Sequence, residues 1–289
     1  MRVLIIGARG QLGTDLVREL AGWDVSATTS AQLDVCDFGG TRRLLLDLRP
    51  ELVINTSAYH RVDDCEHEAE RAFLVNAHAV RNLAMVCAEL DAVLTHFSTD
   101  YVFGGERDLP YTESDLPGPL SVYGNSKLSG EHMVRVCCPR HFIVRTCGLY
   151  GVAGASGKGG NFVETMLRLA RDGKPIRVVD DQVLTPTYTL DLAKKIKELV
   201  ETDAFGLYHL TSNSSCSWFE FAAKVFELTG VRADLAPTTS AAFAARAKRP
   251  AYSVLDNTRM RALGFQDMRP WQEALAAYLQ EKGHMRLAA

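Results

Sequence analysis

The sequence predicts an α/β fold built on a doubly wound parallel sheet, with a smaller mixed α/β lobe attached to it. Short β-branched segments alternate with helical patterns through the first half of the chain, as a parallel sheet with crossover helices requires. A glycine-rich turn directly follows the first segment and opens the first helix. That position is where open α/β sheets commonly hold a ligand.

Five strands are expected in the first half, each a short run rich in β-branched residues. They cover residues 2–6, 24–28, 51–57, 92–99 and 141–146. Between them, apolar residues recur at helical spacing over 11–20, 41–48, 66–90 and 123–136.

After residue 146 the character of the chain changes. The stretch 151–161 is rich in glycine, and the patterns after it predict a helix from about 162 to Gly173, a strand at 175–181, a helix at 189–201 and a strand at 205–212. Ser217 and Glu220 form a capping-box pattern that opens another helix, which Gly230 ends. We therefore expect one domain over 1–147 and a second lobe mainly over 148–289, with segments near 176–204 returning to the first.

Composition and charge indicate which classes of partner the protein can be expected to bind. The 289 residues are 47% hydrophobic and 23% charged, which suits a well-buried core. The net charge is -3 and no stretch concentrates lysine and arginine, so neither nucleic acid nor a membrane surface is an expected partner. Without a signal-peptide core or a run of about 18 apolar residues, a cytoplasmic protein is expected. The seven cysteines lack metal-site spacing, so reduced thiols and no metal site are expected.

The motif "GARGQLG" places Gly7, Gly10 and Gly13 between the first strand and the first helix. Glycines there allow a tight turn and the close approach of a pyrophosphate, which the N–H groups at the helix start can hold. The alternative is a turn whose glycines serve packing alone. No acidic residue ends the second strand to bind a ribose 2′-OH, and Arg9 can meet a 2′-phosphate, which slightly favours NADPH over NADH. The first domain is therefore predicted to be an NAD(P)-binding Rossmann domain.

A second motif joins Tyr123 and Lys127, which stand four residues apart on a predicted helix and so share one face. A nearby ammonium lowers the pKa of a tyrosine because it favours the phenolate. The ammonium can also donate to the ribose hydroxyls of a nicotinamide cofactor. Alone, the pair is equally typical of a surface contact.

The strand at 92–99 supplies the third element, because it ends in Ser98, Thr99 and Asp100. A hydroxyl at this edge of the sheet can hydrogen-bond a substrate carbonyl, and Asp100 can anchor a sugar hydroxyl. The alternative is that these residues only cap a turn. Glycine turn, strand-end hydroxyls and Tyr-x-x-x-Lys, in this order, together predict a site for hydride transfer.

With these motifs the chain resembles the extended short-chain dehydrogenase/reductases and, among them, the dTDP-4-dehydrorhamnose reductase family. The resemblance runs from residue 7 to past residue 250. Its motifs are "GxxGQLG" (7–13), "INTSAYHRVDDCE" (54–66), "STDYVF" (98–103), "YGNSKLSGE" (123–131), "NFVETMLRLA" (161–170), "DDQVLTPTY" (180–188), "SWFEFA" (217–222) and "RPAYSVLD" (249–256).

The resemblance implies an NAD(P)H-dependent reductase of the C4 keto group of a nucleotide-linked 6-deoxysugar, above all dTDP-4-dehydro-L-rhamnose, which becomes dTDP-L-rhamnose. It implies that Tyr123 is the proton donor, that Lys127 is its partner and a ribose ligand, and that Thr99 polarises the C4 carbonyl. The implied substrate contacts are Thr99, Asp100, Tyr101 and Asn161. The implied cofactor contacts, beside Tyr123 and Lys127, are Gly7, Gly10, Gln11, Leu12, Gly13, Asp34, Val35, Ala58, Tyr59 and His60. For Asp34, a contact to the adenine amino group competes with a role in a turn.

Two positions depart from the family pattern. The family commonly reads "RTSWVY", with a tryptophan on the sugar ring, where this chain reads "RTCGLY" and has Gly148. Leu184 in "DQVLTPT" stands where the family has glycine. We therefore expect a reshaped sugar pocket. The glycine-rich segment 151–160 is either a linker or a lid that brings Lys158 to the substrate diphosphate.

Other functions remain open at the level of sequence. One is a reductase or epimerase of another nucleotide sugar. Dehydratases of the superfamily usually have Asp-Glu after the strand-end threonine, whereas Tyr101 follows Asp100 here. Another is a non-catalytic regulatory subunit resembling the partner of methionine adenosyltransferase, which also lacks the tryptophan. The presence of Thr99, Tyr123 and Lys127 favours an enzyme, and a homodimer is left open.

Overall fold

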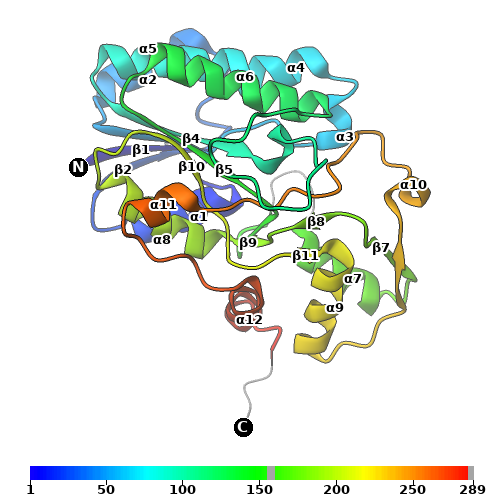
Figure 1. Cartoon of the computed structure of the whole chain (residues 1–289). Coiled ribbons are helices and arrows are strands. Elements are labelled where there is room, and N and C mark those ends of the chain that lie inside the picture. Colours follow the sequence, from blue (N-terminus) through cyan, green and yellow to red (C-terminus); the bar gives the residue numbers. More distant parts are fainter. Residues whose placement is uncertain (155–159, 286–289) are drawn as a thin grey trace.

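A parallel sheet of six strands forms the centre of the protein (Figure 1), in the order β10-β5-β4-β3-β1-β2. The computed structural model describes residues 1–154 and 160–285. The strands are β1 (Arg2–Ile6), β2 (Asp24–Thr28), β3 (Leu52–Asn55), β4 (Val93–Thr99), β5 (His141–Thr146) and β10 (Gly206–His209). Every neighbouring pair in this sheet is parallel. This is the predicted doubly wound, Rossmann-like sheet, and the fold class is confirmed.

Helices cover both faces of the sheet (Figure 1). The upper face in the figure carries α2 (Phe38–Leu48), α4 (Ala69–Phe73), the π-helix η1 (Leu74–His78), α5 (Ala79–Glu89) and α6 (Val122–Cys137). The lower face carries α1 (Gln11–Glu19), α8 (Thr189–Val200) and α11 (Thr258–Ala262). The predicted helix at 66–90 is therefore three consecutive segments, with a π-helical turn in the middle.

The two helical layers explain why the strands read as continuous apolar runs. In β1, Val3 and Ile5 pack with the α1 and α8 layer, whereas Leu4 and Ile6 pack with the α2, α5 and α6 layer. Side chains alternate between the faces of a strand, so a strand covered on both sides must be apolar at every position. All four of these side chains are buried.

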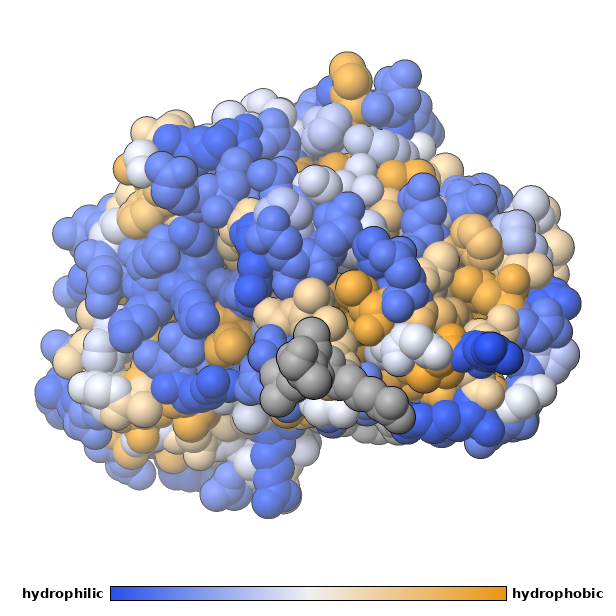
Figure 2. All heavy atoms as spheres, turned by 90° about the horizontal axis from the view of Figure 1, so that it is seen from below, coloured by the Kyte–Doolittle hydropathy of each residue, from blue (hydrophilic) through white to orange (hydrophobic). Residues whose placement is uncertain are grey.

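The smaller lobe has its own core and lies beside the carboxyl ends of the strands. Its helices are α7 (Phe162–Arg171), α9 (Trp218–Thr229), α10 (Ser240–Phe243) and α12 (Trp271–Glu281). Its strand pairs are β6 (Leu149–Tyr150) with β9 (Thr187–Tyr188), β7 (Ile176–Val179) with β12 (Leu235–Thr238), and β8 (Val183–Leu184) with β11 (Cys216–Ser217). Tyr150, Phe221 and Trp271 pack together in this core. Seen from below, hydrophobic surface gathers on the side where Figure 1 shows α7 and α9 (Figure 2).

Most predicted elements lie within one to three residues of the observed ones. The capping box of Ser217 and Glu220 is present, and Gly230 ends α9 with a φ of 66°. The strand predicted at 205–212 is β10, which joins the main sheet beside β5, a place that the sequence did not indicate. The returning helix α8 packs against α1. The division of the chain at residues 147 and 148 stays a prediction.

Two further expectations concern the redox state of the cysteines and membrane-spanning segments. The seven cysteines all fall in the described ranges and none forms a disulfide. In residues 1–154 and 160–285, no helix is both long and apolar enough to cross a bilayer.

A buried ion pair ties α6 to the sheet. Arg145 of β5 and Glu131 of α6 are 1% and 0% exposed. The Arg145 Nε donates to Glu131 Oε1 at 2.8 Å, and its Nη2 donates to Oε2 at 2.7 Å. The guanidinium also lies 5.0 Å from the centre of the Phe103 ring. A planar fork of this kind fits a carboxylate well, which fixes the helix against the strand.

We expect Arg145→Met to destabilise the protein by about 3–5 kcal/mol, because it leaves the Glu131 carboxylate buried without its partner. The double variant Glu131→Leu/Arg145→Met removes both charges and should recover most of that loss. Urea denaturation of the wild type and both variants measures this. A single variant within about 1 kcal/mol of the wild type would contradict the prediction.

Candidate active site

The glycine turn has a backbone that only glycine fits. Gly7 has a φ of 86°, and a Cβ there would lie 2.5 Å from Thr56 Oγ1. A Cβ on Gly13 would lie 2.3 Å from the Gly7 carbonyl oxygen. Gly10 caps α1 without a side chain, so no capping side chain occupies the N–H groups at the start of that helix. Such a helix end can hold a pyrophosphate, so the glycine turn and the start of α1 together fit a dinucleotide.

The turn lies where the strand order reverses, since β1 stands between β2 and β3 in the sheet. Dinucleotides bind at such switch points. Asp34 is exposed beyond the end of β2, and its Oδ1 accepts from the Cys36 N–H at 2.9 Å. Asp34 therefore does form a turn, and its contact with adenine stays a prediction.

A buried asparagine holds the other predicted cofactor loop, residues 58–60. Asn76 Oδ1 accepts from the Tyr59 N–H at 2.8 Å, and Asn76 Nδ2 donates to the Tyr59 carbonyl at 2.9 Å and to Ser126 Oγ at 3.0 Å. Asn76 lies in the π-helix η1 and is fully buried. π-Helical turns often occur at functional sites. The sequence analysis missed Asn76, although an amide inside an apolar helical pattern is a signal that could have revealed it.

Gln11 links the glycine turn to the smaller lobe. Its Oε1 accepts from the Gly151 N–H at 3.1 Å, and its Nε2 lies 3.5 Å from the Leu149 carbonyl oxygen. The side chain of this predicted cofactor residue therefore points to the lobe, and its backbone N–H faces the start of α1.

The structure packs the end of β4 and the turn η2 that follows it against α6, the helix that carries Tyr123 and Lys127. Thr99 ends β4, while Tyr123 and Lys127 lie in the first two turns of α6. The Thr99 side chain lies beside the Tyr123 phenol, where it opposes the rise of the phenol pKa. Thr99 also caps η2 (Asp100–Val102), because its Oγ1 accepts from the Tyr101 N–H at 3.2 Å. Thr99 can therefore cap this turn and also lie beside Tyr123.

The start of α6 is fixed by residues on two other segments. Ser121 Oγ accepts from the Gly124 N–H at 3.2 Å, and Glu66 Oε1 accepts from the Val122 N–H at 2.9 Å. A carboxylate at a helix N-terminus is favourable because the helix dipole is positive there. Glu66 therefore helps to position Tyr123, a role that the sequence analysis did not assign.

Burial controls the protonation of the site. Lys127 is 2% exposed, and burial lowers the pKa of its ammonium to about 8, against the opposing effect of Glu131. Burial raises the pKa of the Tyr123 phenol, which the hydrogen bond with Thr99 counteracts in part. His96, fully buried on β4, has a pKa well below its usual value because of burial and the charge of Lys127. The phenol thus keeps its proton at neutral pH, as a proton donor must.

The predicted substrate residues occupy different environments. Tyr101 packs edge-to-face on Tyr123 with ring centres 6.0 Å apart. Asn161 caps α7 and donates from Nδ2 to the Gly151 carbonyl and the Tyr278 hydroxyl, both at 3.0 Å. Asp100 is 3% exposed. Contacts of Asp100 and Asn161 with a substrate stay predictions, and Lys158 lies outside the described residues.

The two departures from the family pattern meet in space. Gly148 has a φ of 55°, and a Cβ there would lie 3.0 Å from Leu184 Cδ1 and 3.2 Å from Pro186 Cα. Leu184 is buried, while Gly148 is half-exposed. The leucine therefore fills space beside position 148, and that position presents only backbone to the solvent.

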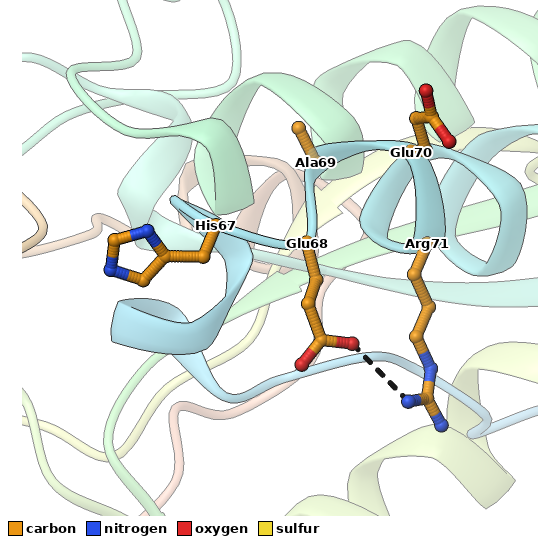
Figure 3. Close-up of a pocket in the computed structure, with 5 residues that line it drawn as sticks. All are labelled: His67, Glu68, Ala69, Glu70 and Arg71. Atoms are coloured by element: carbon orange, nitrogen blue, oxygen red, sulfur yellow. Dashed lines mark hydrogen bonds and ion pairs between the residues drawn. The ribbon is translucent and has the colours of Figure 1, made fainter.

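A separate surface hollow of about 450 Å³ lies on the outer side of α4 (Figure 3). It is lined by His67, Glu68, Ala69, Glu70 and Arg71. Glu68 and Arg71 point toward one another and form an ion pair at 3.2 Å, whereas His67 and Glu70 point away from it. The hollow contains none of the groups that surround Tyr123.

Comparisons with known proteins agree with this geometry. A family model described as the RmlD substrate binding domain matches residues 1–283. The dTDP-4-dehydrorhamnose reductase of Streptomyces griseus is 40% identical over 283 residues, which cover 95% of this chain and 91% of the relative. A Streptomyces antibioticus protein, named a probable dTDP-4,6-dihydroxy-2-methyloxan-3-one 4-ketoreductase, is 41% identical over 280 residues, with coverages of 95% and 93%.

A solved structure is similar over the whole chain. The dTDP-4-dehydrorhamnose reductase of Bacillus anthracis, crystallised in complex with NADP, has a TM-score of 0.92 and 39% identity. The match covers 97% of this chain and 99% of the crystallised one.

Gly148→Ala should destabilise the protein more than Gly173→Ala. Both glycines have a positive φ, which costs an alanine about 1 kcal/mol or more, but a Cβ at Gly173 has nothing within 4 Å. In a Leu184→Ala background, the extra cost at Gly148 should shrink toward that at Gly173. Thermal and urea unfolding of these variants measures the difference, and equal losses at the two glycines in the wild-type background would contradict it.

Proposed function

The chain belongs to the family of the RmlD substrate binding domain, and on that premise we propose that it reduces the 4-keto group of a dTDP-linked 6-deoxysugar with NADPH. It is an NAD(P)-dependent oxidoreductase of nucleotide sugars. The observation that carries this function is the contact between the carboxyl end of β4, where Thr99 lies, and the first turns of α6, which carry Tyr123 and the buried Lys127. Such a group of residues is not needed by a non-catalytic regulatory subunit.

The residues around Tyr123 divide the work of the reaction. The bound cofactor supplies the hydride. Tyr123 gives its proton to the C4 oxygen, and Lys127 stabilises the resulting phenolate through its positive charge. We assign Thr99 to the support of Tyr123, because its hydroxyl hydrogen is donated to Asp100 Oδ1 at 2.9 Å and its side chain lies beside the phenol. The glycine turn and the N-terminus of α1 hold the pyrophosphate.

We assign dTDP-4-dehydro-L-rhamnose as the substrate, with another dTDP-linked 4-keto sugar as the second candidate. The second candidate is favoured by Gly148 and Leu184, which give this chain a different surface beside the reacting groups. Relatives of nearly equal identity carry names that refer to different keto sugars, so overall identity does not discriminate between them.

NADPH is the cofactor we assign, with NADH as the comparison. A 39% identical structure holds NADP, and Arg9 is exposed in the glycine turn, where a guanidinium can pair with a 2′-phosphate. A cytoplasmic location and a homodimer stay predictions from the sequence.

Purified protein should oxidise NADPH in the presence of dTDP-4-dehydro-L-rhamnose, measured as loss of nicotinamide absorbance. Tyr123→Phe should lower kcat by about 100-fold or more, because the acid is lost. Tyr208→Phe is the matched control, since Tyr208 is buried on β10 and donates to a backbone carbonyl away from this site. No turnover with either cofactor would reject the function, and faster turnover of dTDP-4-keto-6-deoxy-D-glucose would favour the second candidate sugar.

The rate of reduction should fall as the pH rises through about 8, where buried Lys127 loses its charge. The pKa of this lysine is lowered in the folded protein, so the active, charged form is present below that pH and lost above it. Tyr123 cannot produce this limb because its own pKa is raised. Lys127→Arg keeps a positive charge at higher pH and should move the limb upward in a pH profile of kcat/KM. An unmoved limb would show that another group titrates.

A further inference from the structure

We propose that Asp100 is a positioning residue, which Cys147 and Ser253 hold in place and which orients the Thr99 hydroxyl beside Tyr123 without contacting the sugar. This inference rests on the proposed reductase function. It replaces the direct contact with a sugar hydroxyl that the sequence predicts for Asp100.

Both oxygens of the Asp100 carboxylate are already occupied. Thr99 Oγ1 donates to Oδ1 at 2.9 Å, and the Cys147 thiol donates to Oδ2 at 3.0 Å. The buried Ser253 side chain lies beside this carboxyl and lowers its pKa. Only 3% of the residue is exposed, and its two oxygens already accept from Thr99 and Cys147.

The contact with Asp100 determines how the Thr99 hydroxyl is used. A hydroxyl has one hydrogen to donate and two lone pairs to accept with. The hydrogen goes to Asp100, and one lone pair accepts from the Tyr101 N–H at 3.2 Å. The Thr99 side chain also lies beside the Tyr123 phenol and opposes the rise of its pKa, so the second lone pair is available to that hydroxyl. Asp100 therefore acts on the proton donor through Thr99.

Three segments far apart in the sequence meet at Asp100, which makes its position rigid. Cys147 directly follows β5, and Ser253 belongs to the chain that passes β8, where the Ser253 N–H donates to the Val183 carbonyl at 2.9 Å. Burial raises the pKa of the Asp100 carboxyl, and the hydrogen bonds from Cys147, Ser253 and Thr99 oppose this rise. The carboxylate is thus supported by donors from three directions.

The donor at position 147 distinguishes this chain from the family pattern "RTSWVY", which has serine there. A thiol is a weaker donor than a hydroxyl, so Cys147 supports Asp100 less firmly than serine would. Replacement by serine should keep the contact, whereas replacement by alanine removes it.

The test is a double-mutant cycle on kcat and KM. We expect Asp100→Asn to lower kcat by about tenfold or more, with KM for the keto sugar within about threefold of the wild type. Because Asp100 acts through Thr99, Asp100→Asn/Thr99→Val should be no slower than Thr99→Val alone. A raised KM with unchanged kcat would show a sugar contact, and losses that multiply in the double variant would show independent roles. Either result overturns the proposal.

Substitutions at cysteine supply the matched controls. Cys147→Ser should retain kcat within about twofold and Cys147→Ala should lose several-fold, while Cys87→Ala, which removes an equally buried thiol from α5, should leave kcat unchanged. Equal kcat in Cys147→Ala and the wild type would count against the proposed support.

A crystal structure of Asp100→Ala gives a readout that does not depend on activity. The Thr99 side chain should turn away from its wild-type rotamer, and an unchanged Thr99 would overturn the proposal even if the wild type reduced no keto sugar. Failure of turnover in the wild type would reject the proposed function alone.

Discussion

The contact between the carboxyl end of β4 and the first turns of α6 brings Thr99 beside Tyr123, and the site depends on it. Hydrogen bonds from other residues fix both the helix that carries Tyr123 and the Thr99 side chain. Glu66 and Ser121 fix the start of α6, and Asp100 and the Tyr101 N–H fix Thr99. A proton donor must lie within a few tenths of an ångström of its productive position, which explains why so many buried polar groups surround one phenol.

Burial shifts the pKa values of the ionisable groups in the site, and it also disfavours their charged forms. Taking Lys127 out of water disfavours its charge, so its pKa falls to about 8 and its protonation becomes sensitive to pH near neutrality. Glu131 lies one turn further along α6 and opposes that fall, while Arg145 holds the Glu131 carboxylate. The ion pair between α6 and β5 therefore belongs to the same electrostatic system as Lys127.

The smaller lobe is coupled to the cofactor side through polar side chains as well as through chain connectivity. Gln11 reaches from the glycine turn to the backbone of Leu149 and Gly151, and Thr189 donates to the buried Asp15 of α1 at 2.5 Å. Arg249, from the segment that also supplies Ser253, pairs with Asp63 next to the loop at 58–60. These contacts fix the smaller lobe and the glycine turn relative to one another.

The sequence by itself determined the fold class, most helix and strand positions, and the residue types that can bind a nicotinamide cofactor and donate a proton. These features are local: strand and helix periods, the glycine turn and the capping box of α9 all follow from neighbouring residues. Tertiary structure alone decided that β10 joins the main sheet, that Asn76 holds the loop at 58–60, and that Asp100 is enclosed by Cys147 and Ser253. It also decided that Leu184 fills the space beside Gly148, although the two residues are far apart in the chain. No local pattern encodes such contacts, because they arise only when segments distant in sequence pack together and exclude water.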